Sequence, residues 1–145
     1  MLSNTCKYAI RAAVYVGLNN EDGKKIGIKK ISEELDMPSP FLGKIMQTLA
    51  KNKILISTKG PNGGFALGKK PEDISLLDII KIFDGLDVFH ECVIGLKFCE
   101  KDPAFKKKCP YGSKIDPLLE QFYKEFEKQT IADFAHDYED VKSML

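Results

Sequence analysis

Three of the four cysteines lie close together in the chain, at Cys92, Cys99 and Cys109, with six and nine residues between them. Neither interval is the two-residue spacing of a structural zinc knuckle. Thiolates are the preferred ligands of iron–sulfur clusters, so this segment could bind such a cluster, which takes four protein ligands. Two other interpretations stay open: a metal-free redox sensor, in which the lysines at 106–108 favour thiolates, or three unrelated thiols in an irregular loop.

Other kinds of chemistry have little support in the composition. The chain has no Trp and two histidines, His90 and His136, so the histidine-based triads of hydrolases have few residues available. A glycine-rich run at 60–64 joins two predicted strands rather than a strand and a helix. It therefore lacks the helix N-terminus that a phosphate-binding loop of a nucleotide enzyme needs. We expect no enzymatic activity.

The N-terminal segment is apolar but carries Lys7 and Arg11 within its pattern, and it lacks the order of a secretory signal. No apolar run reaches the ~18 residues needed to span a bilayer. The chain is 43% hydrophobic and 30% charged over 145 residues, which suits one folded domain of ordinary size. We expect a cytoplasmic protein with no membrane partner, whose cysteines are thiols or metal ligands rather than disulfides.

Charge is distributed unevenly along the chain. Residues 1–71 contain 12 Lys and Arg against 5 Asp and Glu, a net charge of +7, whereas residues 72–145 contain 10 against 16, a net charge of −6. A basic first half and an acidic second half are typical of a domain that binds a polyanion and a second part that stays away from it. A chance segregation of solvated surface charge would explain the same numbers.

The basic half contains the pattern of two helices joined by a tight turn. Apolar residues predict a mostly buried helix over 4–19 and a short amphipathic helix over 28–35. A proline-containing turn follows, with Ser39 as the N-cap and Pro40 as the first residue of a helix that extends to Asn52. The buried stripe of this helix is Phe41, Leu42, Ile45, Met46 and Leu49, and the solvent-exposed stripe is Lys44, Gln47, Thr48 and Lys51. This arrangement predicts a helix-turn-helix.

A predicted hairpin follows the second helix directly. Residues 54–58 and 64–67 are predicted as two strands, and glycines between them allow the positive φ that a turn needs. A basic hairpin with Lys59 near its tip, after a helix-turn-helix, is interpreted as a DNA-binding wing rather than as a plain surface turn. The candidate DNA-contacting residues are then Ser39, Pro40, Lys44, Gln47, Thr48, Lys51, Lys59, Gly60, Pro61, Asn62, Gly63 and Gly64.

The next segment is predicted to be a short helix and a loop. Ser75 can cap a helix over 76–83, and Gly85 ends it. Residues 86–113 have the composition of a loop, with three cysteines and two prolines.

A long C-terminal helix is predicted to begin at Asp116 and Pro117. Its apolar stripe needs a partner, which is either the winged helix of the same chain or the same helix of a second chain. We favour the second chain, because a winged helix that reads a palindromic site also needs a dimer. The stripe consists of Leu118, Leu119, Phe122 and Phe126, and Thr130 can cap a last short helix over 131–138.

These elements define a mainly α-helical fold with one small β-hairpin. The winged helix-turn-helix covers 1–84, the cysteine-containing segment 85–113, and the dimerisation helix with a short terminal helix 114–145. A winged helix that binds another protein instead of DNA is the alternative from a different functional class.

Two kinds of DNA contact are expected from the candidate residues. Lys44 and Gln47 suit base edges, whereas Lys51 and Lys59 suit phosphates. In a homodimer, the two recognition helices would enter successive major grooves about 34 Å apart on a double-stranded DNA operator.

Several segments spread over nearly the whole chain form a further pattern. They are TKGPNGGFAL at 58–67, ISLLDI at 74–79, Lys7-Tyr8-Ala9, the helix from Ser39 to Leu49, CVIGLKFC at 92–99 and Cys109-Pro110. In these segments the chain resembles the IscR/NsrR-type (Rrf family) transcriptional regulators. The resemblance implies a homodimeric winged-helix DNA-binding protein that senses iron–sulfur, redox or nitric oxide status. In many members the cysteine segment binds a [2Fe–2S] cluster, which the resemblance assigns here to Cys92, Cys99 and Cys109.

The chain departs from this family at the fourth cluster ligand. Some members have a histidine where Gly112 stands here, and others have an acidic ligand, from the opposite chain, where Lys7 stands here. Cys6, next to that position, and His90, two residues before Cys92, are the candidates in their place. Each also has an ordinary explanation, Cys6 as a small buried residue and His90 as an exposed loop residue. The interval before the third cysteine is longer than in well-known members, and the family includes members without a cluster.

Overall fold

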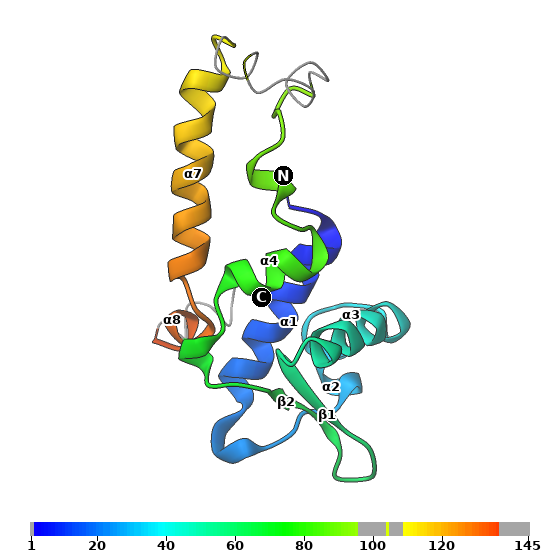
Figure 1. Ribbon diagram of the computed structural model, residues 1–145. Coiled ribbons are helices and arrows are strands. Elements are labelled where there is room, and N and C mark those ends of the chain that lie inside the picture. Colours follow the sequence, from blue (N-terminus) through cyan, green and yellow to red (C-terminus); the bar gives the residue numbers. More distant parts are fainter. Residues whose placement is uncertain (1, 96–103, 105–108, 137–145) are drawn as a thin grey trace.

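The structure is a computed structural model of the chain, and it describes residues 2–95, 104 and 109–136 (Figure 1). Within those residues it is mainly helical with one antiparallel hairpin, so the predicted fold class is confirmed. The helices are α1 (Asn4–Asn19), α2 (Ile28–Glu34), α3 (Ser39–Lys51), α4 (Leu76–Phe83), α7 (Gly112–Lys128) and α8 (Ile131–His136). The strands are β1 (Leu55–Thr58) and β2 (Gly64–Leu67), and short 3₁₀ turns cover Glu21–Gly23, Pro71–Asp73 and Asp87–Phe89.

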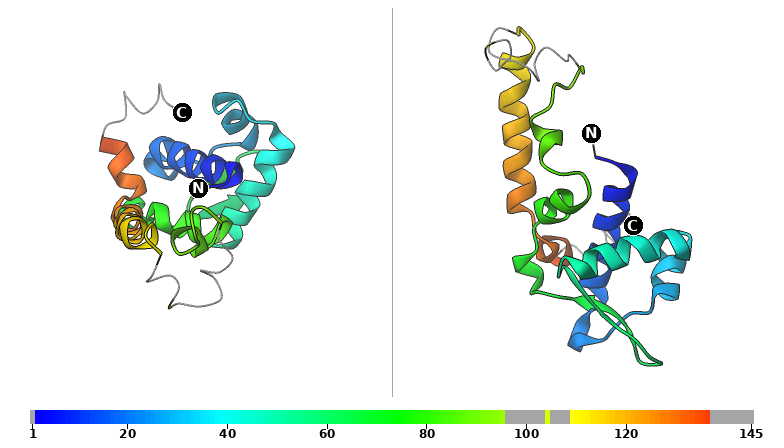
Figure 2. Two further views of the ribbon diagram at one scale, coloured as in Figure 1. Left: turned by 90° about the horizontal axis from the view of Figure 1, so that it is seen from above. Right: turned by 45° about the vertical axis from the view of Figure 1, so that its right-hand side comes forward.

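Helix α1 forms the centre of the molecule because most of its faces carry small or apolar side chains. Its Ala9, Ala12 and Ala13 are completely buried. Helices α2 and α3 pack on one side of α1, and α4 and α8 pack on the other (Figure 2). A Cβ atom on Gly17 would come within 2.4 Å of the Ile131 side chain, so the absence of a side chain at Gly17 lets α8 pack directly on α1.

The turn between α2 and α3 differs from the prediction at one residue. Helix α3 begins at Ser39 and the extended Pro38 precedes it as the N-cap, so the prediction of Ser39 as the N-cap is wrong. The carbonyl oxygen of Pro38 accepts the amides of Phe41 and Leu42 at 3.1 and 3.0 Å. The Ser39 hydroxyl donates instead to the Ser32 hydroxyl at 2.9 Å, which joins α3 to α2 at the turn.

The apolar stripe of α3 is buried as predicted except at its first member. Phe41 is 38% exposed, so the prediction that it is buried is wrong. Its ring meets the ring of Tyr8 edge-on, with 5.6 Å between the centroids. At the first turn of α3 the ring is thus covered from one side by Tyr8 rather than enclosed in the core. The buried members are Leu42, Ile45, Met46 and Leu49.

The hairpin has a second paired edge that the sequence pattern did not indicate. Strand β1 begins at Leu55, one residue later than predicted, and pairs antiparallel with β2 so that Leu55 lies opposite Leu67. On the other edge of β2, Ile26 and Phe65 exchange two backbone hydrogen bonds, at 2.9 and 2.8 Å. The segment that leads into α2 is therefore fixed to the hairpin.

The glycines of the hairpin have conformational roles. Gly60 and Gly64 have φ angles of +108° and +138°, as the turn prediction requires. The Gly63 amide donates to the Gly60 carbonyl at 2.9 Å and closes the turn. A Cβ atom on Gly63 would lie 2.2 Å from the carbonyl oxygen of Thr58, and one on Gly64 would lie 2.6 Å from that of Ile26. The hairpin can therefore approach its neighbours closely because these positions lack side chains.

Helix α4 has both of its predicted end signals. The Ser75 hydroxyl accepts the Asp78 amide and the Asp78 carboxylate accepts the Ser75 amide, each at 3.1 Å, which forms a capping box. Gly85 follows the helix with φ +75°, and its amide donates to the Ile80 carbonyl at 3.1 Å. Both predictions are confirmed.

Helix α7 begins at Gly112 rather than at Asp116, so its predicted start is wrong. Its first turn is formed by hydrogen bonds such as that from the Ile115 amide to the Tyr111 carbonyl, at 2.8 Å. Pro117 therefore lies inside the helix. Proline is favoured in the first turn of a helix, so Pro117 suggested a start at Asp116, later in the chain than the observed start at Gly112.

Helix α8 packs into the head of the molecule. Ile131 is completely buried in the same apolar core as α1 and α3. Thr130 precedes the helix, and its amide and hydroxyl both donate to the Asp133 carboxylate, at 2.6 and 3.0 Å. The Thr130 side chain thus donates to a carboxylate instead of accepting a helix amide, as the predicted cap would require. Residues 137 and 138 of the predicted helix lie outside the described residues.

Candidate DNA-binding surface and cysteine pocket

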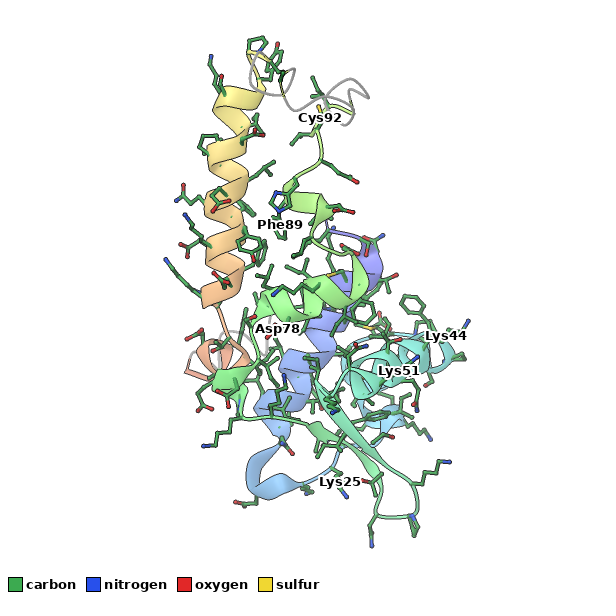
Figure 3. The ribbon with its side chains drawn as sticks, viewed as in Figure 1. Lys25, Lys44, Lys51, Asp78, Phe89 and Cys92 are labelled. Carbon is green, nitrogen blue, oxygen red and sulfur yellow. The ribbon has the colours of Figure 1, made fainter. Side chains whose placement is uncertain are left out.

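One face of α3 carries the predicted recognition residues. Lys44, Gln47 and Lys51 are exposed, and Figure 3 shows the two lysines on this helix. Thr48 is half-buried and its hydroxyl donates to the Lys44 carbonyl at 2.9 Å, so part of its hydrogen-bonding capacity is already used. Ser39 and Pro40 are exposed at the start of α3. The face thus offers two ammonium groups and one amide to a partner.

The hairpin places the second group of predicted residues at one end of the molecule. Lys59, Gly60, Pro61 and Asn62 are exposed, as a contact surface requires. Gly63 and Gly64 are half-buried, and their close approaches to backbone atoms explain why these positions are glycines. The tip of the hairpin therefore provides the accessible part of the predicted wing.

The apolar stripe of α7 is divided between two surroundings. Leu119 is buried, and Phe126 packs against Phe89 with 6.0 Å between ring centroids. Leu118 and Phe122 are 56% and 46% exposed and line an open groove of ≈ 510 Å³. The other lining residues are Leu76, Gln121, Glu125, Phe126 and Gln129. One side of the stripe thus packs on its own chain, and the other leaves large apolar side chains uncovered.

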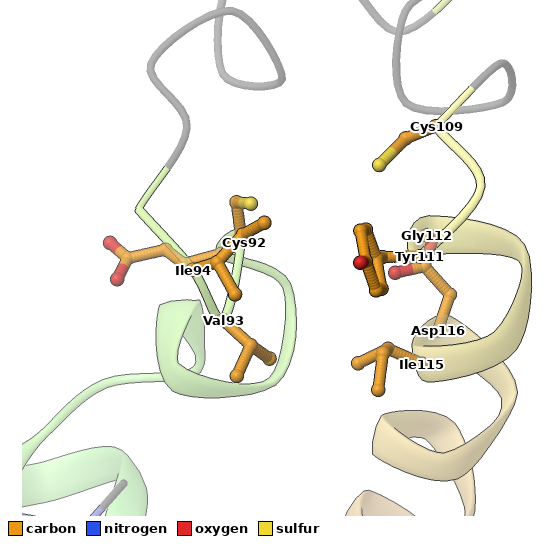
Figure 4. Close-up of a pocket in the computed structure, with 9 residues that line it drawn as sticks. Cys92, Val93, Ile94, Cys109, Tyr111, Gly112, Ile115 and Asp116 are labelled. Atoms are coloured by element: carbon orange, nitrogen blue, oxygen red, sulfur yellow. The ribbon is translucent and has the colours of Figure 1, made fainter.

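Cys92 and Cys109 line one small pocket at the end of the molecule farthest from the hairpin (Figures 1 and 4). One wall comes from residues 91–94 and the other from Cys109 and the start of α7. Figure 4 shows both sulfur atoms turned toward the space between the walls. The pocket has a volume of ≈ 90 Å³, and Val93, Ile94, Tyr111 and Ile115 give it a largely apolar lining.

The donor atoms at this pocket agree in kind with a [2Fe–2S] cluster. Two of the three predicted thiol ligands face one apolar space, and thiolate is the donor that such a cluster prefers. Cys99 lies outside the described residues. Within the described residues, no three His, Cys, Asp or Glu side chains are arranged to bind a metal ion. A complete set of four ligands would thus need Cys99 and one further residue to join the pair.

Cys6 has the surroundings of a packing residue. It is 0% exposed and lies in an apolar cluster with Leu77, Ile80 and Phe89. Burial, with the neighbouring Asp84 carboxylate adding to it, raises the pKa of the Cys6 thiol to about 12. The thiol therefore stays protonated near neutral pH, a state that does not favour metal binding.

His90 lies near the pocket but does not line it. The side chain is exposed, and its ring centroid is 6.5 Å from that of Tyr123. The residues that line the pocket and were absent from the predicted site are Glu91, Val93, Ile94, Tyr111, Gly112, Ile115 and Asp116. In the sequence they were indicated only by their proximity to Cys92 and Cys109. Because the helix was predicted to begin at Asp116, Tyr111 and Gly112 were assigned to a loop and not to a wall of the pocket.

A helix-turn-helix followed by an antiparallel hairpin, with a cationic recognition helix, defines the winged-helix class of regulators. Within that class, the chain belongs to the Rrf2 family, whose model is described as "Iron-dependent Transcriptional regulator" and matches residues 2–137. It is therefore a transcriptional regulator rather than an enzyme, and this role implies DNA binding.

Known relatives match nearly the full length of the chain. An HTH-type transcriptional regulator of Aquifex aeolicus is 32% identical over 136 residues, which cover 94% of this chain and 92% of the relative. The HTH-type transcriptional regulator NsrR of Oceanobacillus iheyensis is 27% identical over 139 residues, which cover 95% and 91%.

Solved structures of low sequence identity share the fold. The global cysteine regulator CymR of B. subtilis has a TM-score of 0.76 at 18% identity, and the match covers 94% of this chain and 96% of CymR. IscR of T. potens has a TM-score of 0.69 at 20% identity, and the match covers 97% of this chain and 90% of IscR.

Among the described residues, no helix has the length and apolar character needed to cross a membrane.

Proposed function

We propose that this regulator binds an operator in double-stranded DNA as a homodimer, with α3 in the major groove and the hairpin on the adjacent backbone. The observation that supports this most directly is the exposure of Lys44, Gln47 and Lys51 on one helix of a head with net charge +7 over residues 1–71. Lys44 and Gln47 suit hydrogen bonds to base edges. Lys51 and the hairpin residue Lys59 suit phosphates, which fix the register of the protein on the duplex.

Replacement of Lys59 with glutamine tests the hairpin contact. The slope of the logarithm of the association constant against the logarithm of the salt concentration is negative, because each phosphate that the protein neutralises releases about 0.9 counterions. Loss of one contact should therefore make this slope less steep by about one. The measurement is fluorescence anisotropy of a labelled mixed-sequence duplex over a series of salt concentrations. Binding should weaken by a similar factor for all DNA sequences.

Lys81→Gln is the matched control, because Lys81 is also exposed but lies on α4. It should leave the slope unchanged. An unchanged slope in Lys59→Gln would remove the hairpin from the interface. Salt-independent association, or none, in the native protein would instead favour a winged helix that binds another protein.

We further propose that Cys92, Cys99 and Cys109 bind a [2Fe–2S] cluster, and that the presence or absence of the cluster changes DNA binding by the winged helix. The orientation of the Cys92 and Cys109 sulfur atoms into one apolar pocket supports this. The bound cluster would supply redox chemistry and reactivity toward nitric oxide. Phe89 lies between α4 and Cys92 in the chain, and its ring packs edge-on against Tyr123 of α7 at 5.6 Å. A change at the pocket can thus reach the packing of α7.

Anaerobic reconstitution with iron and sulfide tests the cluster. The native protein should develop visible absorbance and contain about two iron atoms per chain, and Cys92→Ala should lose most of both. Cys6→Ala is the matched control, because that thiol is buried away from the pocket and should leave absorbance intact. Loss of absorbance in Cys6→Ala would contradict the packing role of Cys6.

A cluster-free thiol sensor is the second candidate, because Cys92 and Cys109 face the same space. It predicts that an oxidant changes DNA affinity in protein that takes up no iron and sulfide. If neither reconstitution nor oxidation alters absorbance or DNA binding, both sensing proposals fail while DNA binding stands.

A further inference from the structure

A second cationic site lies between the end of α1 and the start of α2. It is an open pocket of ≈ 320 Å³ in which the charged groups are all lysines. Its lining residues are Leu18, Asn19, Lys24, Lys25, Ile26, Gly27 and Lys30. The lining therefore contains three ammonium groups and no carboxylate.

The pocket is held firmly against the hairpin. Ile26, between Lys25 and Gly27 in the lining, exchanges two backbone hydrogen bonds with Phe65 of β2, at 2.9 and 2.8 Å. Gly64 of the same strand approaches the Ile26 carbonyl so closely that a Cβ atom there would lie 2.6 Å away. Figure 3 shows Lys25 beside the hairpin. A ligand bound by these lysines would therefore lie next to whatever the hairpin contacts.

The charge of the pocket favours an anion. Lys24, Lys25 and Lys30 are all exposed, and no ion pair joins any of them to a carboxylate of the described residues. Three neighbouring ammonium groups repel one another, and an anion between them relieves that repulsion. Lysine binds phosphate as a point charge and does not require a fixed orientation. Phosphodiesters thus match the pocket in charge and in donor chemistry.

We propose that this lysine pocket binds phosphate groups of the DNA backbone beyond the segment read by α3, beside the contact made by the hairpin. The inference rests on the proposed DNA binding and adds Lys24 and Lys25 to the interface. Continuity with the hairpin favours a duplex over a free anion, because the pocket and the hairpin share a sheet edge. In a homodimer each subunit would place one such pocket beside its own wing.

A Lys24→Gln/Lys25→Gln variant tests the proposal. The native protein is first used to select duplexes from a random pool, and anisotropy then gives the slope of log K against log salt. Loss of two phosphate contacts should make this negative slope less steep by about 1.8. Lys81→Gln on α4 should keep the native slope. In ethylation interference, modification of the phosphates beside the wing contact should no longer prevent binding of the double variant, whereas interference at the other contacted phosphates should be retained.

The possible failures are distinguishable. If the native protein binds duplex with a steep salt dependence and the double variant has the same slope, the lysine pocket is overturned and the proposed function stands. If inorganic phosphate shifts the NMR signals of Lys24 and Lys25 while the DNA slope is unaltered, the pocket is a small-anion site and the inference is overturned. If the native protein does not bind duplex DNA, the inference falls together with the proposed function.

Discussion

Replacement of Phe122 with aspartate is expected to give a monomer that binds two-half-site DNA about 10²–10⁴-fold more weakly than the native protein. Phe122 is 46% exposed beside Leu118, which is 56% exposed, on a groove that its own chain leaves open. In the proposed homodimer the same helix of a second chain covers this groove. A carboxylate at its centre would be buried without a partner and would oppose association. Each head would then bind alone, and the gain from two linked contacts would be lost.

Lys124→Asp is the control for this variant. It introduces the same acid on α7, but Lys124 does not line the groove and its ion pair with Glu120, at 3.4 Å, joins two exposed side chains. Such pairs contribute little to stability, so this variant should remain dimeric. Analytical ultracentrifugation gives the oligomeric state, and circular dichroism verifies that Phe122→Asp is folded. A dimeric, fully active Phe122→Asp protein would place the dimer interface elsewhere.

A few contacts join α1 to α4, and the segment after α4 to α7. Ser3 donates to the Asp84 carboxylate from its amide at 2.7 Å and from its hydroxyl at 2.5 Å, which ties the start of α1 to the end of α4. Phe89 then joins the segment after α4 to Phe126 of α7. A rearrangement at the cysteine pocket can therefore bias the position of α7 relative to the head. That coupling requires different DNA affinities in the two states, as the sensing proposal assumes.

The sequence predicted several elements whose causes are local. The cap at Ser75, the end of the helix at Gly85 and the basic turn at Lys59 depend on residues within a few positions of each other. The pairing of Ile26 with Phe65 depends on chain segments far apart, and a single paired residue has no periodicity that a pattern can detect. The lysine pocket beside it was missed for the same reason.

The two candidate sites show the same division. Alternation of polar and apolar residues along α3 predicted the exposed face at Lys44 and Gln47, because a helix fixes those positions relative to one another. Spacing indicated that Cys92 and Cys109 belong together, but the pocket that they share also needs the start of α7. The apolar stripe of α7 was predicted as one face, and tertiary packing divides it between a buried part and an exposed part. Buried Leu119 and exposed Leu118 are indistinguishable by residue type.

Gly64→Ala is expected to lower the free energy of unfolding by about 2–4 kcal/mol, a large part of the stability of an ordinary domain. Two effects add. The φ of +138° is a conformation that alanine adopts only with strain, of order 1–3 kcal/mol. The new Cβ atom would also lie 2.6 Å from the Ile26 carbonyl, which is backbone and cannot rotate away. The Ile26–Phe65 hydrogen bonds would have to break or shift, and urea denaturation monitored by circular dichroism measures the result.

Gly60→Ala separates the two effects because it has the first without the second. Gly60 also has a positive φ, +108°, but a Cβ atom there would have nothing within 4 Å. It should cost only the conformational strain, so the difference between the two variants measures the close approach of the hairpin to the α2 entry segment. Equal losses would mean that the Ile26 contact contributes nothing. A smaller loss in Gly64→Ala would contradict the packing described for this edge, and with it the fixed position of the lysine pocket beside the wing.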